Sequence, residues 1–182
     1  PILTPLAVDP AHPFPFISNL SFNIAALIRD PESGEQQFAR VKIPQKNLPR
    51  FLKLPVELAG DNGALYTAVP LEQVVAFNLT LLFPGMTIEG HYFFRVTRDA
   101  DLELRELEAD DLMIALQEGL RKRRMGGEVV RLEVSDEMPE DVVDLLKEGM
   151  AVEADDLYRV NGPLGLDDLF GLMGVPLPQF KD

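Results

Sequence analysis

The chain has 182 residues, which is enough for one domain with a hydrophobic core, and 46% of the residues are hydrophobic. Its 30 acidic and 17 basic residues give a net charge of -13, so an evenly charged surface would repel nucleic acid, anionic lipid and polyphosphate. The absence of cysteine excludes disulfides, thiol catalysis and thiolate metal sites, and no apolar run is long enough to span a bilayer. Because the chain starts at Pro1 without Met and ends after a Pro-spaced tail, we expect a piece of a longer protein.

The first half of the sequence predicts mainly strands. Residues 1–16 hold five prolines and are expected to form an extended lead-in. Alternating and apolar residues at 20–29 and 36–43 flank a turn signal at 30–34, which predicts a β-hairpin whose first strand is central.

Further strands are predicted at 51–54, 64–69 and 86–96, with a helix from Pro70 to Leu82.

The second half predicts alternating helices and strands. Helical spacing and opposed charged ends predict a helix over 106–124, with Arg121, Lys122, Arg123 and Arg124 in its last turn. A strand at 128–134 is followed by a helix opening at 138–141, whose buried face should hold Val142, Val143, Leu145 and Leu146. A strand at 157–160 and helical turns at 166–173 complete the chain. The fold class predicted is α+β, layered, with a mixed or mainly antiparallel sheet.

The junction at 93–104 is the main candidate for an anion site. Its apolar strand ends in Arg95 and Arg98, and guanidinium groups bind phosphate or carboxylate bidentately. With Lys42, these arginines are the candidate anion-binding residues, although they could equally pair with nearby acids.

The other candidate catalytic and metal-ligating residues lack, in the sequence, the partners that such sites need. His12 and His91 have no catalytic or metal-ligand partner at a recognised spacing, and Asp99, Asp101 and Glu103 are more typical of a solvated face than of a Mg²⁺ site. The basic run 121–124 is better explained by dipole compensation than by anion binding. No phosphate loop, nucleophile elbow or dinucleotide fingerprint is present, so we predict no catalytic residue and no metal site in this chain.

Eight short blocks together resemble the bacterial polyphosphate kinase family, in the same order and spacing along the whole chain. They are PFPFISNLS (13–21), ARVKIP (39–44), LPRF (48–51), FPG (83–85), FRVTRDAD (94–101), VRLEV (130–134), MP (138–139) and YRVNGPL (158–164). Enzymes of that family move the terminal phosphate of ATP reversibly onto inorganic polyphosphate. The resemblance implies that residues 1–182 are the middle, or head, domain alone, with 1–16 as lead-in and 174–182 as an exit linker.

The resemblance also implies where the chemistry lies. In the family the phosphorylated histidine, the Mg²⁺ ligands and most ATP contacts belong to C-terminal catalytic domains, and an N-terminal domain helps to cover the adenine. The middle domain is associated with dimer assembly and with packing against those neighbours. We therefore expect no cofactor in this chain, with Mg²⁺ and ATP bound by a cytoplasmic parent that can associate with membranes. Its expected partners are the neighbouring domains and a second copy, and not nucleic acid. A free-standing anion-binding module and a metal-dependent hydrolase remain as alternatives.

Overall fold

The protein is described by a computed structural model that covers residues 3, 5–8, 14–45, 48–59, 66–99 and 127–175. The chain forms two compact units. Unit 1 contains residues 1–7, 23–91 and 165–182, and unit 2 contains residues 8–22 and 92–164.

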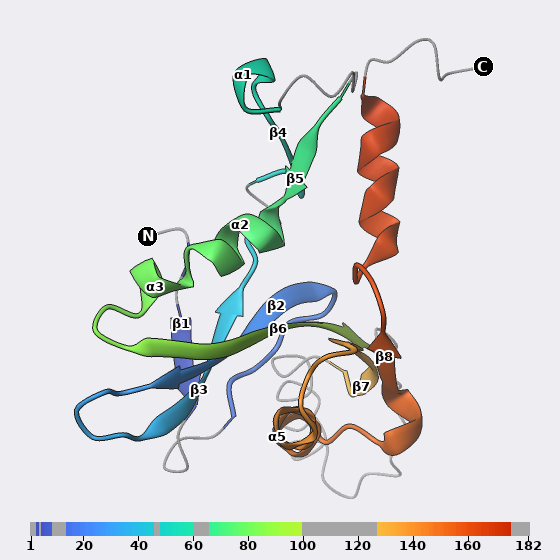
Figure 1. Cartoon of the computed structure of the whole chain (residues 1–182). Helices are drawn as coiled ribbons and strands as arrows, with labels where there is room; N and C mark the ends of the chain where they lie inside the picture. The colour runs from blue at the N-terminus through green and yellow to red at the C-terminus, as the bar shows by residue number, and fades with distance from the viewer. Residues whose placement is uncertain are drawn as a thin grey trace, which may run out of the picture. The chain divides into compact units, whose positions relative to one another are not determined.

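The strands form a mixed six-stranded sheet in the order β1-β3-β2-β6-β7-β8 and a separate pair, β4-β5 (Figure 1). The bounds are β1 Pro5–Val8, β2 Ser21–Arg29, β3 Gln36–Lys42, β4 Phe51–Lys53, β5 Ala68–Pro70, β6 Thr87–Arg98, β7 Val129–Ser135 and β8 Leu157–Val160. The pairs β2–β3 and β6–β7 are antiparallel, whereas β7 and β8 are parallel. The predicted α+β class with a mixed sheet is confirmed.

The predicted hairpin is the β2–β3 pair, in register from Asn23 opposite Lys42 to Arg29 opposite Gln36. Its turn depends on Asp30, whose carbonyl accepts the backbone N–H of Gly34 at 2.8 Å while its carboxylate accepts that of Glu32. Gly34 has φ +73°, a conformation that side chains with a Cβ rarely adopt. The first six residues of β2 are all buried, as expected for a central strand.

The predicted helix over 70–82 is two helices, α2 Leu71–Phe77 and α3 Leu79–Leu82, preceded by the short α1 Val56–Ala59. The single-helix prediction was wrong because of Asn78. Its side-chain amide donates to the Val74 carbonyl at 2.8 Å, and its own N–H bonds to Val75 three residues back instead of four. An asparagine that competes in this way for backbone groups interrupts a helix. Leu71, Val75 and Leu79 are buried.

In unit 2, helix α5 Glu140–Met150 buries Val142, Val143 and Leu146, while Leu145 is only half-buried. Other buried core residues of this unit include Ile17, Phe22, Phe94, Val96, Leu132, Val134 and Met138. A short 3-10 helix, η1 Ala154–Asp156, leads into β8. The predicted strand at 157–160 is therefore confirmed at its stated bounds.

The predicted helical turns at 166–173 are the 3-10 helix η2 Leu166–Gly174, in unit 1. The predicted helix over 106–124 lies outside the described residues. Strand β6 continues two residues beyond the predicted end at 96, so Arg98 is its last residue. In the part of the chain that the structure describes, each helix is too short or too polar to cross a membrane.

Candidate functional site

Arg98 is held by protein groups of unit 2. Its Nε donates to the Ile17 carbonyl at 2.7 Å and its NH1 donates to the Gly127 carbonyl at 2.8 Å. The guanidinium lies 4.6 Å from the centroid of the Phe16 ring, which suits a cation–π contact. Burial lowers the pKa of Arg98 from its usual value. These contacts attach the segment before β2 to the end of the β6–β7 pair.

Arg95 belongs to a ladder of paired charges across β6 and β7. It stands opposite Glu133 in the strand register, with Arg95 NH1 3.3 Å from Glu133 Oε2. The same carboxylate accepts a second guanidinium, since Arg131 NH2 lies 3.0 Å from Glu133 Oε1. Arg131 in turn lies 4.0 Å over the Tyr158 ring of β8. Cross-strand pairs of this kind stabilise a sheet.

The third candidate, Lys42, is exposed at the end of β3 and belongs to unit 1, whereas Arg95 and Arg98 belong to unit 2. The three predicted anion ligands are thus divided between the units, and anion binding by them stays a prediction.

The other candidates stay predictions as well. Asp99 is exposed after β6, and His91 is exposed within β6. The residues His12, Asp101, Glu103 and Arg121 to Arg124 lie outside the described part of the chain. Among described residues, no group of three or more His, Asp or Glu is placed to hold a metal ion.

A buried ionic cluster in unit 1 was missed by the sequence analysis. Arg50, just before β4, donates from Nε and NH2 to Glu72 Oε1 of α2 at 3.1 and 2.8 Å. Its NH1 donates to Asp168 Oδ2 at 3.0 Å and to the Gly165 carbonyl at 2.5 Å, both at the start of η2. The side chains of Arg50 and Glu72 are each 7% exposed. We call Arg50, Glu72 and Asp168 the Arg50 cluster.

The Arg50 cluster borders a cavity of about 330 Å³. Its lining residues are Gln45, Leu48, Pro49, Arg50, Phe51, Tyr66, Asp168, Gly171 and Leu172. Arg50 already donates to two carboxylates, so the cluster carries one excess negative charge and offers poor electrostatics for a phosphate. Its arrangement is suited to fixing η2 against β4 and α2.

Two sets of large apolar side chains are exposed on unit 1. The first, on α2 and α3, we call the α2–α3 patch; it consists of Val74 (36% exposed), Phe77 (88%) and Leu81 (76%). The second we call the η2 stripe; it consists of Leu166 (57%), Leu169 (41%), Phe170 (74%) and Met173 (69%). Large contiguous patches of exposed apolar side chains are typical of interaction surfaces.

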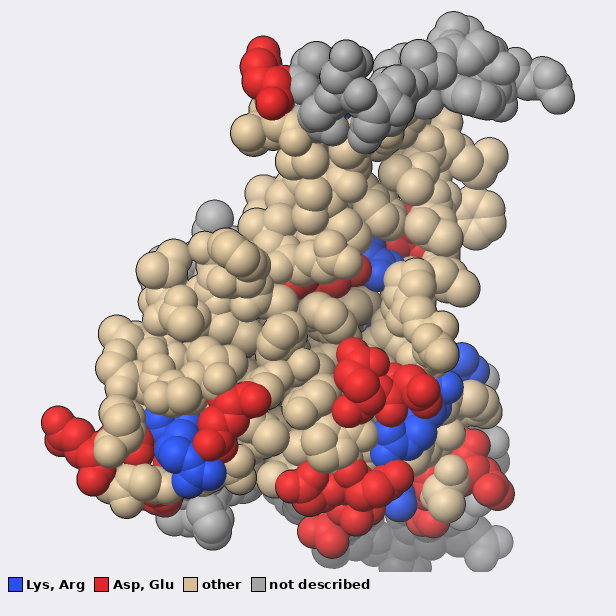
Figure 2. Space-filling view, in the orientation of Figure 1, with Lys and Arg blue, Asp and Glu red and all other residues tan. Residues whose placement is uncertain are grey.

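The α2–α3 patch is also free of charge. No Asp, Glu, Lys or Arg occurs from Gln73 to Met86. Figure 2 shows the surface over α2 and α3 as largely tan, whereas the charged residues gather on other parts of the face in view.

The described residues thus form an α+β domain with paired internal charges and with exposed apolar side chains on α2, α3 and η2. Residues 1–172 match the family described as the polyphosphate kinase middle domain, and the chain belongs to that family. The resemblance inferred from the eight sequence blocks is therefore confirmed.

Relatives and a solved structure agree with this assignment. The chain is 75% identical over 183 residues to the polyphosphate kinase of Parasynechococcus marenigrum, covering 100% of this chain and 26% of the relative. It is 56% identical over 182 residues to that of Thermosynechococcus vestitus, covering 100% of this chain and 25% of the relative. The crystal structure of polyphosphate kinase from Porphyromonas gingivalis matches the fold with a TM-score of 0.69 at 22% identity, over 92% of this chain and 22% of that one. The chain thus spans about a quarter of the length of these relatives.

Proposed function

We propose that this chain serves a larger polyphosphate kinase as a non-catalytic middle domain for dimer contacts and inter-domain packing. The parent transfers the terminal phosphate of ATP to inorganic polyphosphate, with Mg²⁺ and both substrates bound by its other domains. The family membership and the names of the relatives support the parent activity. The exposed apolar surface of unit 1 supports the packing role, and it is the observation that carries the proposal.

The proposed function predicts that polyphosphate synthesis requires the full-length parent. The full-length parent forms polyphosphate from ATP in the presence of Mg²⁺, and the 182-residue chain alone forms none. The measurement is incorporation of label from γ-labelled ATP into acid-insoluble polymer, at equal molar concentrations of the two proteins. Synthesis by a clean sample of the chain alone would show that the catalytic groups lie within it.

The second copy is proposed to dock on the α2–α3 patch. Two domains of net charge -13 repel each other, so self-association is least unfavourable where the surface has no carboxylates. A twofold axis presents the same residues from both copies, so each buried side chain counts twice. Fully burying a side chain such as Phe77 or Leu81 contributes about 1.5–3 kcal/mol, part of which offsets the cost of association.

The second prediction tests that contact in the full-length parent. Leu81→Ser should weaken dimerisation by at least about 100-fold, because two buried leucines are lost per dimer. Sedimentation equilibrium at low micromolar protein then reports a shift from the dimer mass toward the monomer mass. Leu58→Ser is the matched control, since Leu58 is 73% exposed on α1 and Leu81 is 76% exposed. Equal masses for both variants and the unmodified parent would contradict the docking site.

A further inference from the structure

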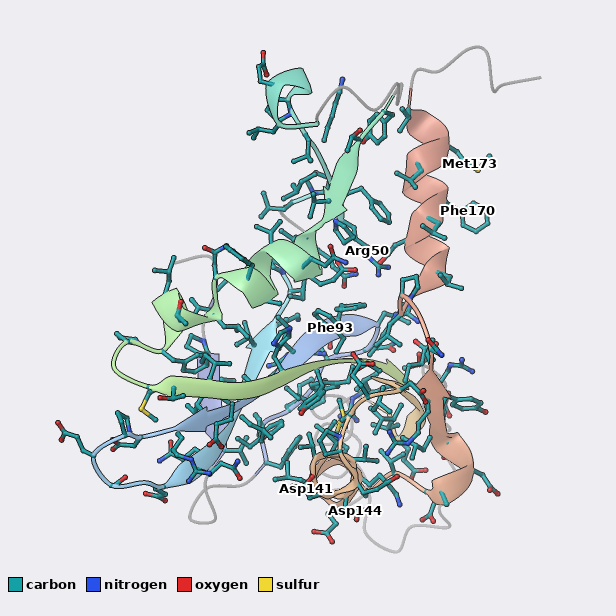
Figure 3. The ribbon with its side chains drawn as sticks, viewed as in Figure 1. Arg50, Phe93, Asp141, Asp144, Phe170 and Met173 are labelled. Carbon is teal, nitrogen blue, oxygen red and sulfur yellow. The ribbon has the colours of Figure 1, made fainter. Side chains whose placement is uncertain are left out.

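Helix η2 directs Asp168 toward Arg50 and exposes its large apolar side chains. On the inner side, Asp168 Oδ2 accepts from Arg50 NH1 at 3.0 Å and from Gln45 Nε2 at 2.9 Å. On the outer side lies the η2 stripe. In Figure 3, Arg50 lies on the side of η2 that faces β5 and α2, while Phe170 and Met173 point away from it. A surface helix usually buries its large apolar side chains, whereas η2 exposes them.

The orientation is fixed by specific bonds. A rotation of η2 that buried Phe170 would gain the free energy of removing apolar area from water. It would also break the bonds from Arg50 to Asp168 and to the Gly165 carbonyl, leaving a guanidinium that is 7% exposed with fewer acceptors. The Arg50 cluster therefore holds the η2 stripe outward.

We propose that the η2 stripe is the docking surface for the C-terminal neighbouring domain of the same polypeptide, which receives it in an apolar hollow with a basic rim. This inference rests on the proposed function, because it requires a larger parent. A middle domain has neighbours on both sides, and the chain spans about a quarter of its relatives. Helix η2 is the last described element of the chain, so it is the element of this middle domain that is nearest in sequence to a C-terminal neighbour.

Tethering favours an intramolecular occupant. A domain of the same polypeptide is held at a high effective concentration, which reaches the millimolar range for a short flexible linker, so a small apolar surface is sufficient.

Charge favours the same occupant. Asp167 is exposed beside the η2 stripe, and no Lys or Arg occurs between Arg159 and Lys181. A second copy would bring acid against acid, whereas a basic rim would complement this edge.

Oxidation of methionine in the full-length parent tests the proposal without any substitution. Met173 is 69% exposed in this domain and Met138 is 2% exposed, so Met138 is an internal reference for a buried thioether. If the neighbouring domain covers the η2 stripe, hydrogen peroxide oxidises Met173 at a rate within about threefold of the rate for Met138. If the stripe is uncovered, Met173 is oxidised at least about tenfold faster than Met138. The rates are read by mass spectrometry of peptides, and fast oxidation of Met173 in the unmodified parent overturns the proposal.

Two variants of the parent identify the occupant. Phe170→Asp is expected to raise the Met173 oxidation rate about tenfold and to leave the sedimentation mass unchanged, since it releases a tethered domain. Leu81→Ser is expected to change the mass and leave the Met173 rate unchanged. If Met173 becomes reactive only when Leu81→Ser separates the copies, the occupant is a second copy and the proposal is wrong. If Met173 is protected and Leu81→Ser leaves the sedimentation mass of the parent unchanged, the α2–α3 contact is refuted and the contact of the η2 stripe with the neighbouring domain is supported.

Discussion

Arg50→Ala is expected to lower the free energy of unfolding by about 3–5 kcal/mol, the cost typical of removing one partner from a buried ion pair. The Arg50 and Glu72 side chains are each 7% exposed, so the truncation leaves the Glu72 carboxylate in a low-dielectric site without its cation. It also removes the donor to the Gly165 carbonyl and to Asp168. Urea denaturation of the 182-residue chain, analysed by linear extrapolation, measures the loss.

A double variant separates the ion pair from simple loss of packing. Arg50→Met with Glu72→Leu removes both charges of the buried pair at similar volume, and is expected to recover the part of the Arg50→Ala loss that comes from the unpaired Glu72 carboxylate. Arg29→Ala is the matched control, because Arg29 forms the same kind of ion pair with Glu89 but its side chain is 40% exposed. Its loss should be much smaller. Equal losses for Arg50→Ala and Arg29→Ala would contradict the assigned role of burial.

The elements that could be predicted from the sequence are those specified by neighbouring residues. The hairpin turn needs Asp30 and a glycine at 34, and both signals lie within five residues. The face of α5 follows from helical periodicity, so Val142, Val143 and Leu146 were placed correctly. The break at Asn78 was missed because it depends on whether the Asn78 side chain donates to a backbone carbonyl or to water, which the sequence does not show.

The Arg50 cluster could not be predicted because its partners are far apart in the chain. Arg50 and Asp168 are separated by 118 residues, and Arg50 looks like a surface residue between Pro49 and Phe51. The resemblance block LPRF marked the position without indicating a partner. In the same way, Arg95 and Arg98 were recognised as notable, but strand register decides that Arg95 meets Glu133.

The exposure of the η2 stripe also could not be predicted from the sequence. Its apolar residues predict a helix, and a surface helix usually packs such residues against the core of its domain. Only the inward bonds of Asp168 show which side faces out.

Gly127→Ala is expected to destabilise the chain by about 3 kcal/mol, as overpacking costs about 1–3 kcal/mol and a lost hydrogen bond adds about 1. A Cβ at this position would lie 2.0 Å from the backbone oxygen of Asp99, and backbone cannot rotate out of the way as a side chain can. To relieve this contact, the backbone at Asp99 would have to move away from the backbone at 127–128. That movement would stretch the hydrogen bond from the Asp99 N–H to the Glu128 carbonyl, which is now 2.9 Å long. It would also move the Gly127 carbonyl away from Arg98 NH1.

Gly171→Ala provides the control, because it adds the same methyl group where no atom lies within 4 Å. In the helix η2 this change is expected to stabilise the chain by up to about 1 kcal/mol, since alanine loses less conformational freedom on folding than glycine. The two variants should therefore shift the urea midpoint in opposite directions. A shift of the same sign and size would mean that the close approach of Gly127 to Asp99 does not limit the β6–β7 end. A selective loss at Gly127 would instead support the close approach of Gly127 to Asp99 as the feature that fixes this end of the β6–β7 pair, where the Gly127 carbonyl also accepts from Arg98.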